Sequence, residues 1–140
     1  MIARASGALL FAYLTLAIAG VVFIFVPSQA VETLSGTPLI VLTWGLFYVI
    51  GGFLAAFCVV ARKFVKNTTP LWYFEVAGIS LVVAANFVFA YALANGAMAS
   101  GQFNVLAAAL VILAFSGGLI ARSVETLRLV SVLRQYSQEA

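Results

Sequence analysis

Arg62-Lys63-Phe64-Val65-Lys66 is a short basic segment between two long apolar runs, Leu39 to Ala61 and Trp72 to Asn95. It holds three of the seven basic residues in a chain of 140 residues. By contrast, the segment from Gly96 to Val111 carries no charged residue. Because basic loops of membrane proteins remain on the cytoplasmic side, this asymmetry predicts how the chain is oriented in a bilayer.

The overall composition also indicates a membrane protein. Hydrophobic residues make up 65% of the chain and charged residues 8%, and the mean hydropathy is +1.18. An average soluble domain has about 45–50% apolar and about 25% charged residues. The apolar runs extend over around twenty residues each, which is the length of a membrane-spanning helix rather than of a barrel strand.

We therefore predict an all-α, polytopic membrane protein in which one domain forms a bundle of four transmembrane helices. Pro27 ends the first apolar run, and Asn67-Thr68-Thr69-Pro70 predicts the start of the third helix, with Thr68 or Thr69 as its cap. The loop from residue 27 to 38 carries Glu32 and no Lys or Arg. The predicted spans are residues 7–26, 39–61, 71–95 and 103–121.

The last part of the chain, residues 122–140, has a different pattern. Leu129, Val132, Leu133 and Tyr136 follow the spacing of one helix face. We predict an amphipathic helix here, which either continues the fourth span into the cytoplasm or lies on the lipid headgroups.

Four spans place both termini on the same side of the membrane. All basic residues then lie on that side. The positive-inside rule therefore places both termini in the cytoplasm, and we predict a protein of the bacterial inner membrane. These residues are Arg4, Arg62, Lys63, Lys66, Arg122, Arg128 and Arg134.

Small and aromatic residues predict how the helices pack and where they meet the membrane surface. Small residues mark places where helices approach closely in lipid, while basic and amphipathic aromatic residues gather at the interface. For Trp44 and Tyr48, four residues apart, we predict a shared face near the outer leaflet. The predicted packing residues are Gly45, Gly52, Ala56, Ala114, Gly117 and Gly118, and the interface residues are Arg62, Lys63, Lys66, Trp72 and Tyr73.

Two polar residues lie inside the third apolar run, Glu75 and Asn86. An ionised side chain costs about 2.5–3.5 kcal/mol at the centre of a span. A transporter would use Glu75 to couple protons or cations, whereas a structural role would pair it with Arg122 or Arg62, and we expect the ion pair. For Asn86 we expect a hydrogen bond to a neighbouring helix, with Tyr91, Thr43 and Ser116 as the candidate partners.

Several functional classes lack the residues they need. The chain has no His, no Asp and a single cysteine, Cys58, so we expect no Ser-His-Asp catalysis, no resident metal or cofactor, and no enzyme. A net charge of +3 is too small and scattered for binding nucleic acid. Ser28-Gln29-Ala30 is similar to a signal-peptidase site, but the preceding apolar run exceeds the usual length of about 7–15 residues, so we expect no cleavage.

Three motifs carry a resemblance to a known group. They are W-x-x-x-Y-x-x-G-G from Trp44 to Gly52, F-E-x-A-G from Phe74 to Gly78, and R-S-x-E-x-x-R from Arg122 to Arg128. The pattern resembles small membrane proteins of actinobacterial phages and prophages, which are often regarded as holins. The resemblance implies a self-associating protein of the bilayer that acts in phage lysis. The alternatives are an accessory subunit of a larger membrane complex and a small transporter that uses Glu75.

Overall fold

The computed structural model describes residues 2–26, 38–101 and 104–139. These residues form α1 (Ile2–Phe25), α3 (Pro38–Ala61), α4 (Thr69–Ser100) and α5 (Asn104–Glu139). All four helices are long and apolar enough to cross a membrane. In the length and composition of its helices, the described part of the chain therefore confirms the prediction of an all-α membrane protein. The predicted loop from residue 27 to 38 lies, except for Pro38, outside the described residues.

The last two helices are longer than predicted. α4 has 32 residues and α5 has 36, which correspond to about 48 and 54 Å at the rise of an α-helix, while the apolar layer of a bilayer is about 30 Å thick. α4 continues through the turn predicted after Asn95 and ends at Gly101, whose φ of 70° is the left-handed conformation that glycine adopts readily. At its start, Thr68 is the cap by position but its side chain makes no capping hydrogen bond; Asn67 Oδ1 accepts one from Thr69 N at 3.3 Å instead.

Residues 122–139 continue the fourth helix, which was one of the two predicted alternatives, but the amphipathic character predicted for this segment is not supported. The chain from Arg122 continues α5 without a break, because this segment contains neither Gly nor Pro to end the helix. Leu129 and Val132, from the predicted apolar face, are 49% and 46% exposed. Thr126 and Val130 are buried instead, among the residues of this segment whose side chains the structure describes.

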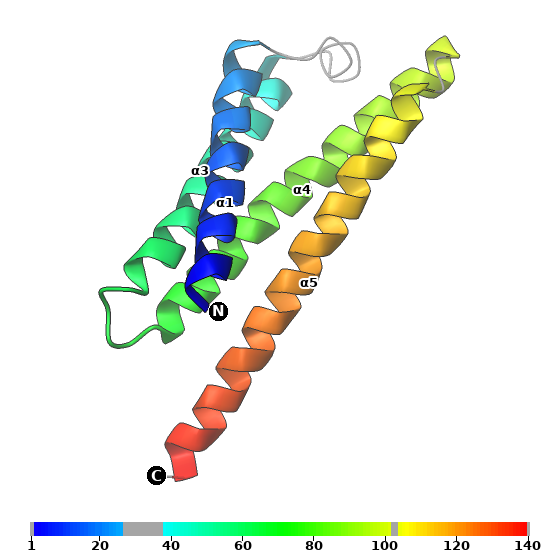
Figure 1. Cartoon of the computed structure of the whole chain (residues 1–140). Helices are drawn as coiled ribbons and strands as arrows, with labels where there is room; N and C mark the ends of the chain where they lie inside the picture. The colour runs from blue at the N-terminus through cyan, green and yellow to red at the C-terminus, as the bar shows by residue number, and fades with distance from the viewer. Residues whose placement is uncertain (1, 27–37, 102–103, 140) are drawn as a thin grey trace.

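The helices pack in the order of the sequence, α1 on α3, α3 on α4, and α4 on α5. Figure 1 shows α4 and α5 side by side, inclined to α1 and α3, with both termini and the α3–α4 connection at the same end. Within the apolar windows of the helices, 17% of the residues of α1 and α5 are buried, against 50% for α3 and 44% for α4. The described residues therefore form an open array of helices rather than a closed bundle.

Glycines allow the helices on either side of α3 to approach closely. A Cβ atom on Gly52 would lie 2.7 Å from Ala17 N and from Tyr13 O, both backbone atoms of α1. On the α4 side, a Cβ on Gly51 would lie 2.5 Å from the carbonyl oxygen of Gly78. Any larger side chain at these two positions would push the helices apart.

The predicted packing residues divide into two groups. Those of α3 lie in the packed part of the array, because Ala56 is buried and a Cβ on Gly45 or Gly52 would lie within 3.0 Å of atoms of α1. Those of α5 do not, because Ala114 is exposed and a Cβ on Gly117 or Gly118 would meet nothing within 4 Å.

Candidate functional site

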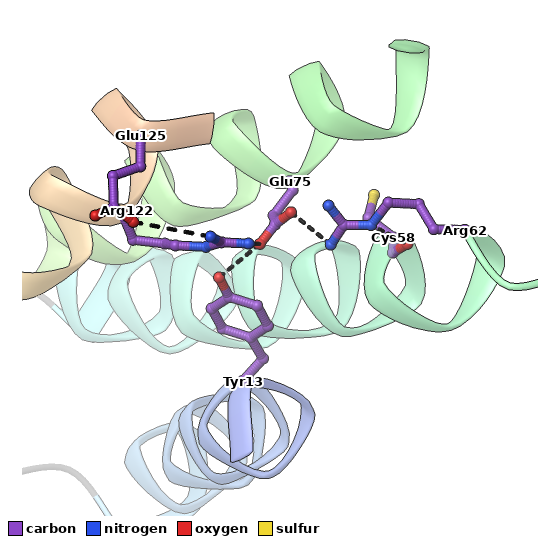
Figure 2. Close-up of polar contacts among 6 residues, drawn as sticks. All are labelled: Tyr13, Cys58, Arg62, Glu75, Arg122 and Glu125. Atoms are coloured by element: carbon purple, nitrogen blue, oxygen red, sulfur yellow. Dashed lines mark hydrogen bonds and ion pairs between the residues drawn. The ribbon is translucent and has the colours of Figure 1, made fainter. Parts of the chain in front are cut away.

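Glu75, in the second turn of α4, is fully buried and lies between the two arginines that the sequence offered as partners. Arg62 Nη2 is 2.6 Å from Glu75 Oε2, and Arg122 Nη2 is 3.8 Å from Oε1. Figure 2 shows the two guanidinium groups approaching the carboxylate from opposite sides. The first contact is ionic rather than a well-aligned hydrogen bond, because Oε2 has no hydrogen-bond partner among the described residues.

Arg62 is held by the end of α3 as well as by Glu75. Its backbone N–H and its Nε both donate to the carbonyl oxygen of Cys58, at 3.2 Å each. A cation at this position interacts favourably with the C-terminal end of a helix dipole. The guanidinium carbon also lies 3.7 Å from the centroid of the Trp72 ring, which adds a cation–π contact.

Tyr13 completes the cluster from α1. Its side chain is buried, and its hydroxyl donates to Glu75 Oε1 at 2.8 Å. This tyrosine was not among the predicted polar contacts. The available signal was a hydroxyl-bearing ring inside the first apolar run, nine residues or about two and a half turns after Arg4.

The cluster thus takes one polar side chain from each part of the array: Tyr13 from α1, Arg62 from the end of α3, Glu75 from α4 and Arg122 from α5. Arg122 is held less tightly than Arg62, with the longer distance to the carboxylate and a side chain 24% exposed against 12%. Its Nη1 also lies 4.0 Å from Glu125, which is 71% exposed.

Asn86 has a different partner from those predicted. The Tyr48 hydroxyl donates to Asn86 Oδ1, and both side chains are buried. Thr43 and Ser116 instead donate to carbonyl oxygens one turn earlier in their own helices, which is common for hydroxyl side chains in helices, and Tyr91 is exposed. Tyr48 and Trp44, four residues apart on α3, are both buried between helices, where their rings contact Phe23 and Phe89; their position near the outer leaflet stays a prediction.

The predicted interface residues follow the expected pattern in part. Lys63 and Lys66 are exposed in the α3–α4 connection, and Tyr73 is 41% exposed. Trp72 is half-buried because the Arg62 guanidinium covers one face of its ring.

Chemically, the cluster contains fixed charges and hydrogen-bond donors. Its carboxylate has a tyrosine hydroxyl and two guanidinium groups around it, which neutralise it within the array and connect the four helices. Comparisons of the chain with protein-family models, curated proteins and solved structures gave no significant match.

Proposed function

We propose that this chain is a holin-like protein of the bacterial inner membrane, which acts in phage lysis by associating laterally with copies of itself. The face of α5 that carries Ala114, Gly117, Gly118 and Ala121 supports this proposal. These small residues follow the i, i+3, i+4, i+7 spacing of one helix face, and all four are exposed. Ser116 and Leu119 of α5 are buried instead, and α4 is the helix against which α5 packs.

A face of small residues is suited to association between membrane helices. Lipid chains are as apolar as the side chains, so helices associate through close backbone packing rather than the hydrophobic effect. The contact at Gly52, where a Cβ would lie 2.7 Å from backbone atoms of α1, is an example within one chain. Gly117 and Gly118 offer α5 the same close approach to a helix of another chain.

The orientation is part of the proposal. Arg4 lies in the first turn of α1, Lys63 and Lys66 follow α3, and Arg128 lies in the last third of α5. These elements meet at the end of the array that contains both termini (Figure 1). The concentration of positive charge at this end supports its placement in the cytoplasm.

The surroundings of Glu75 favour a structural role over transport. A coupling carboxylate must exchange its cation during the transport cycle, whereas Glu75 lies 2.6 Å from Arg62 and accepts a hydrogen bond from Tyr13. Fixed partners on both oxygens support the interpretation that this residue anchors the helices.

Induced expression in bacteria tests the proposal, with membrane potential and chemical cross-linking as the two measurements. We expect the unaltered chain to form cross-linked oligomers and to depolarise the membrane. Gly118→Leu should lower both, because the larger side chain keeps α5 of two copies apart. Gly7→Leu is the matched control, since a Cβ on Gly7 also meets nothing within 4 Å but lies far from this face.

An accessory subunit of a larger complex is the second candidate. Its support is a second unpacked surface on α1, where Phe11, Ile18 and Phe25 are 73%, 63% and 78% exposed. Gentle solubilisation distinguishes the two. A stoichiometric partner protein, together with no cross-links between copies and no depolarisation at high expression, would replace the holin-like proposal with this one.

A further inference from the structure

Several buried hydrogen-bond donors around Glu75 have no partner among the described residues. They are Arg62 Nη1, Arg122 Nε and Trp72 Nε1. The three come from the end of α3, from α5 and from the first turn of α4, and the ring of Trp72 lies 3.7 Å from the Arg62 guanidinium carbon and 5.9 Å from that of Arg122. The Glu75 carboxylate, 2.6 Å from Arg62 Nη2, is the acceptor already present, but none of these three donors is paired with it, and its Oε2 also lacks a hydrogen-bond partner among the described residues. Unpaired buried donors are costly, so the three donors left over call for a further acceptor.

We propose that Arg62, Arg122 and Trp72 form a binding site for a phosphate group, of the kind carried by anionic lipid headgroups and by free phosphate. Guanidinium groups match the geometry of phosphate oxygens and bind them through paired hydrogen bonds. An indole N–H adds a neutral donor. Glu75 stays inside the cluster and orients both arginines, whose side chains are 12% and 24% exposed while that of Glu75 is 0% exposed.

The charge of the cluster fits a singly charged anion. Two guanidinium groups and one carboxylate in contact leave a net charge of +1, which a phosphodiester would balance. Glu125 opposes this at 4.0 Å from Arg122 Nη1, but it is 71% exposed, so solvent screens most of its effect.

Thr126 is an independent observation that supports the site. It lies four residues after Arg122 on α5, and therefore on the same helix face. Its side chain is fully buried, and its hydroxyl oxygen has no hydrogen-bond partner among the described residues. We therefore include this hydroxyl in the proposed site as a fourth donor.

The position of the site suits a headgroup. Trp72 lies in the first turn of α4, and the exposed Lys63 and Lys66 precede it in the α3–α4 connection. Basic pockets between helices at the cytoplasmic side of a membrane are known binding places for anionic headgroups.

Native mass spectrometry of the purified full chain in detergent, with phosphatidylglycerol or phosphatidylcholine added, tests the proposal. We expect at least about tenfold tighter retention of phosphatidylglycerol, because the choline cation of phosphatidylcholine, whose headgroup carries the same phosphodiester, would lie beside a cluster of net charge +1. Arg122→Gln should abolish the preference. Arg128→Gln, which removes the same charge from an exposed position of α5, should leave it unchanged. Equal retention of both lipids would overturn the proposal, and equal effects of the two variants would replace it with diffuse electrostatic attraction.

Two further variants keep the test valid if Arg122→Gln destabilises the protein. Thr126→Val preserves every ion pair of the cluster, and we expect it to weaken retention about fivefold, the contribution of one neutral hydrogen bond. Glu125→Gln removes a charge that solvent largely screens, so it should change retention by less than Thr126→Val does. Unchanged retention in Thr126→Val would contradict the site.

Inorganic phosphate in large excess separates the two sources of the group. If it displaces phosphatidylglycerol from the unaltered chain, the site is open to free phosphate. The second competitor is the soluble phosphodiester that corresponds to the headgroup of phosphatidylglycerol without its acyl chains. If neither competitor displaces phosphatidylglycerol, the site takes the headgroup of a lipid whose chains lie in the bilayer. Both outcomes retain the phosphate chemistry, and neither depends on self-association or lysis.

Discussion

At the scale of single residues, Glu75 is the most constrained side chain of the array. It is fully buried, and it contacts Tyr13, Arg62 and Arg122 from three other parts of the chain. A buried ion pair is costly to form, because both charges lose their hydration, and costly to break, because the remaining charge is left without a partner. The cluster around Glu75 fixes how the four helices meet near the end of the array that contains both termini.

Glu75→Gln is expected to lower the free energy of unfolding in detergent by about 3–5 kcal/mol, the usual cost of removing one partner from a buried ion pair. The measurement is a chemical or thermal unfolding curve followed by helical circular dichroism. The control is Glu125→Gln, whose side chain is 71% exposed and which should change stability by less than about 1 kcal/mol. Equal effects of the two changes would contradict the structural role of Glu75.

Tyr48→Phe tests the other buried polar contact. It removes the hydroxyl that donates to Asn86 while keeping the ring, so we expect a loss of about 0.6–2 kcal/mol, as for other hydrogen bonds between membrane helices. Tyr91→Phe is the matched control, because Tyr91 is 65% exposed. Equal free energies of unfolding for the two variants would show that the hydrogen bond to Asn86 adds no stability.

The sequence predicted one of these two contacts and missed the other. Arg62 and Arg122 were recognisable as partners of Glu75, since charges are rare in the apolar runs and these two lie at a similar depth. Tyr48 was not recognisable as the partner of Asn86, because the depth and rotation of a helix in the array decide which hydroxyl reaches an amide. Composition does not encode either quantity.

At the scale of helices, the same substitution at two glycines should have opposite effects. Gly52→Ala places a Cβ 2.7 Å from backbone atoms of α1, and we expect a loss of about 1–3 kcal/mol, typical of overpacking. Gly117→Ala meets nothing within 4 Å and should be neutral or stabilising by up to about 1 kcal/mol, because alanine favours the helix. Unfolding curves of both variants in monomer-forming detergent provide the measurement. A larger loss from Gly117→Ala would contradict the described packing.

The existence of the helices was predictable, but their lengths were not. Each apolar run of around twenty residues corresponds to one helix. The sequence placed a turn after Asn95, yet α4 continues to Ser100 because Gly96 is the single residue in that stretch with poor helix propensity. Likewise, the apolar spacing after Arg122 left open whether a surface helix or a continuation of the fourth helix follows, and α5 continues because no Gly or Pro intervenes.

At the scale of the whole molecule, labelling of introduced cysteines tests the orientation. In a Cys58→Ala background, Ser100→Cys at the far end of α4 should react with a membrane-impermeant maleimide in intact cells. Lys63→Cys should react only after the cells are opened. Both positions are exposed, so a difference in labelling reports the side of the membrane and not burial. Labelling of Lys63→Cys in intact cells would contradict the proposed topology.

The openness of the array could not be read from the sequence. A closed bundle and an open one need the same number of apolar runs, and in lipid the faces that meet protein and the faces that meet acyl chains have similar composition. Gly52 and Gly117 illustrate this, since both were predicted to pack and only Gly52 has a neighbouring helix among the described residues.

The contact between Glu75 and Arg122 also has a consequence for how the protein is made. Ribosomes deliver the N-terminal part of a chain first, so Arg62 and Glu75 leave the ribosome before Arg122. The 2.6 Å contact with Arg62 gives the nascent carboxylate an ion-pair partner during that interval, and the more distant Arg122 joins when α5 arrives. A gene interrupted before codon 104, where α5 begins, would therefore still encode an insertable three-helix product in which Glu75 is already paired.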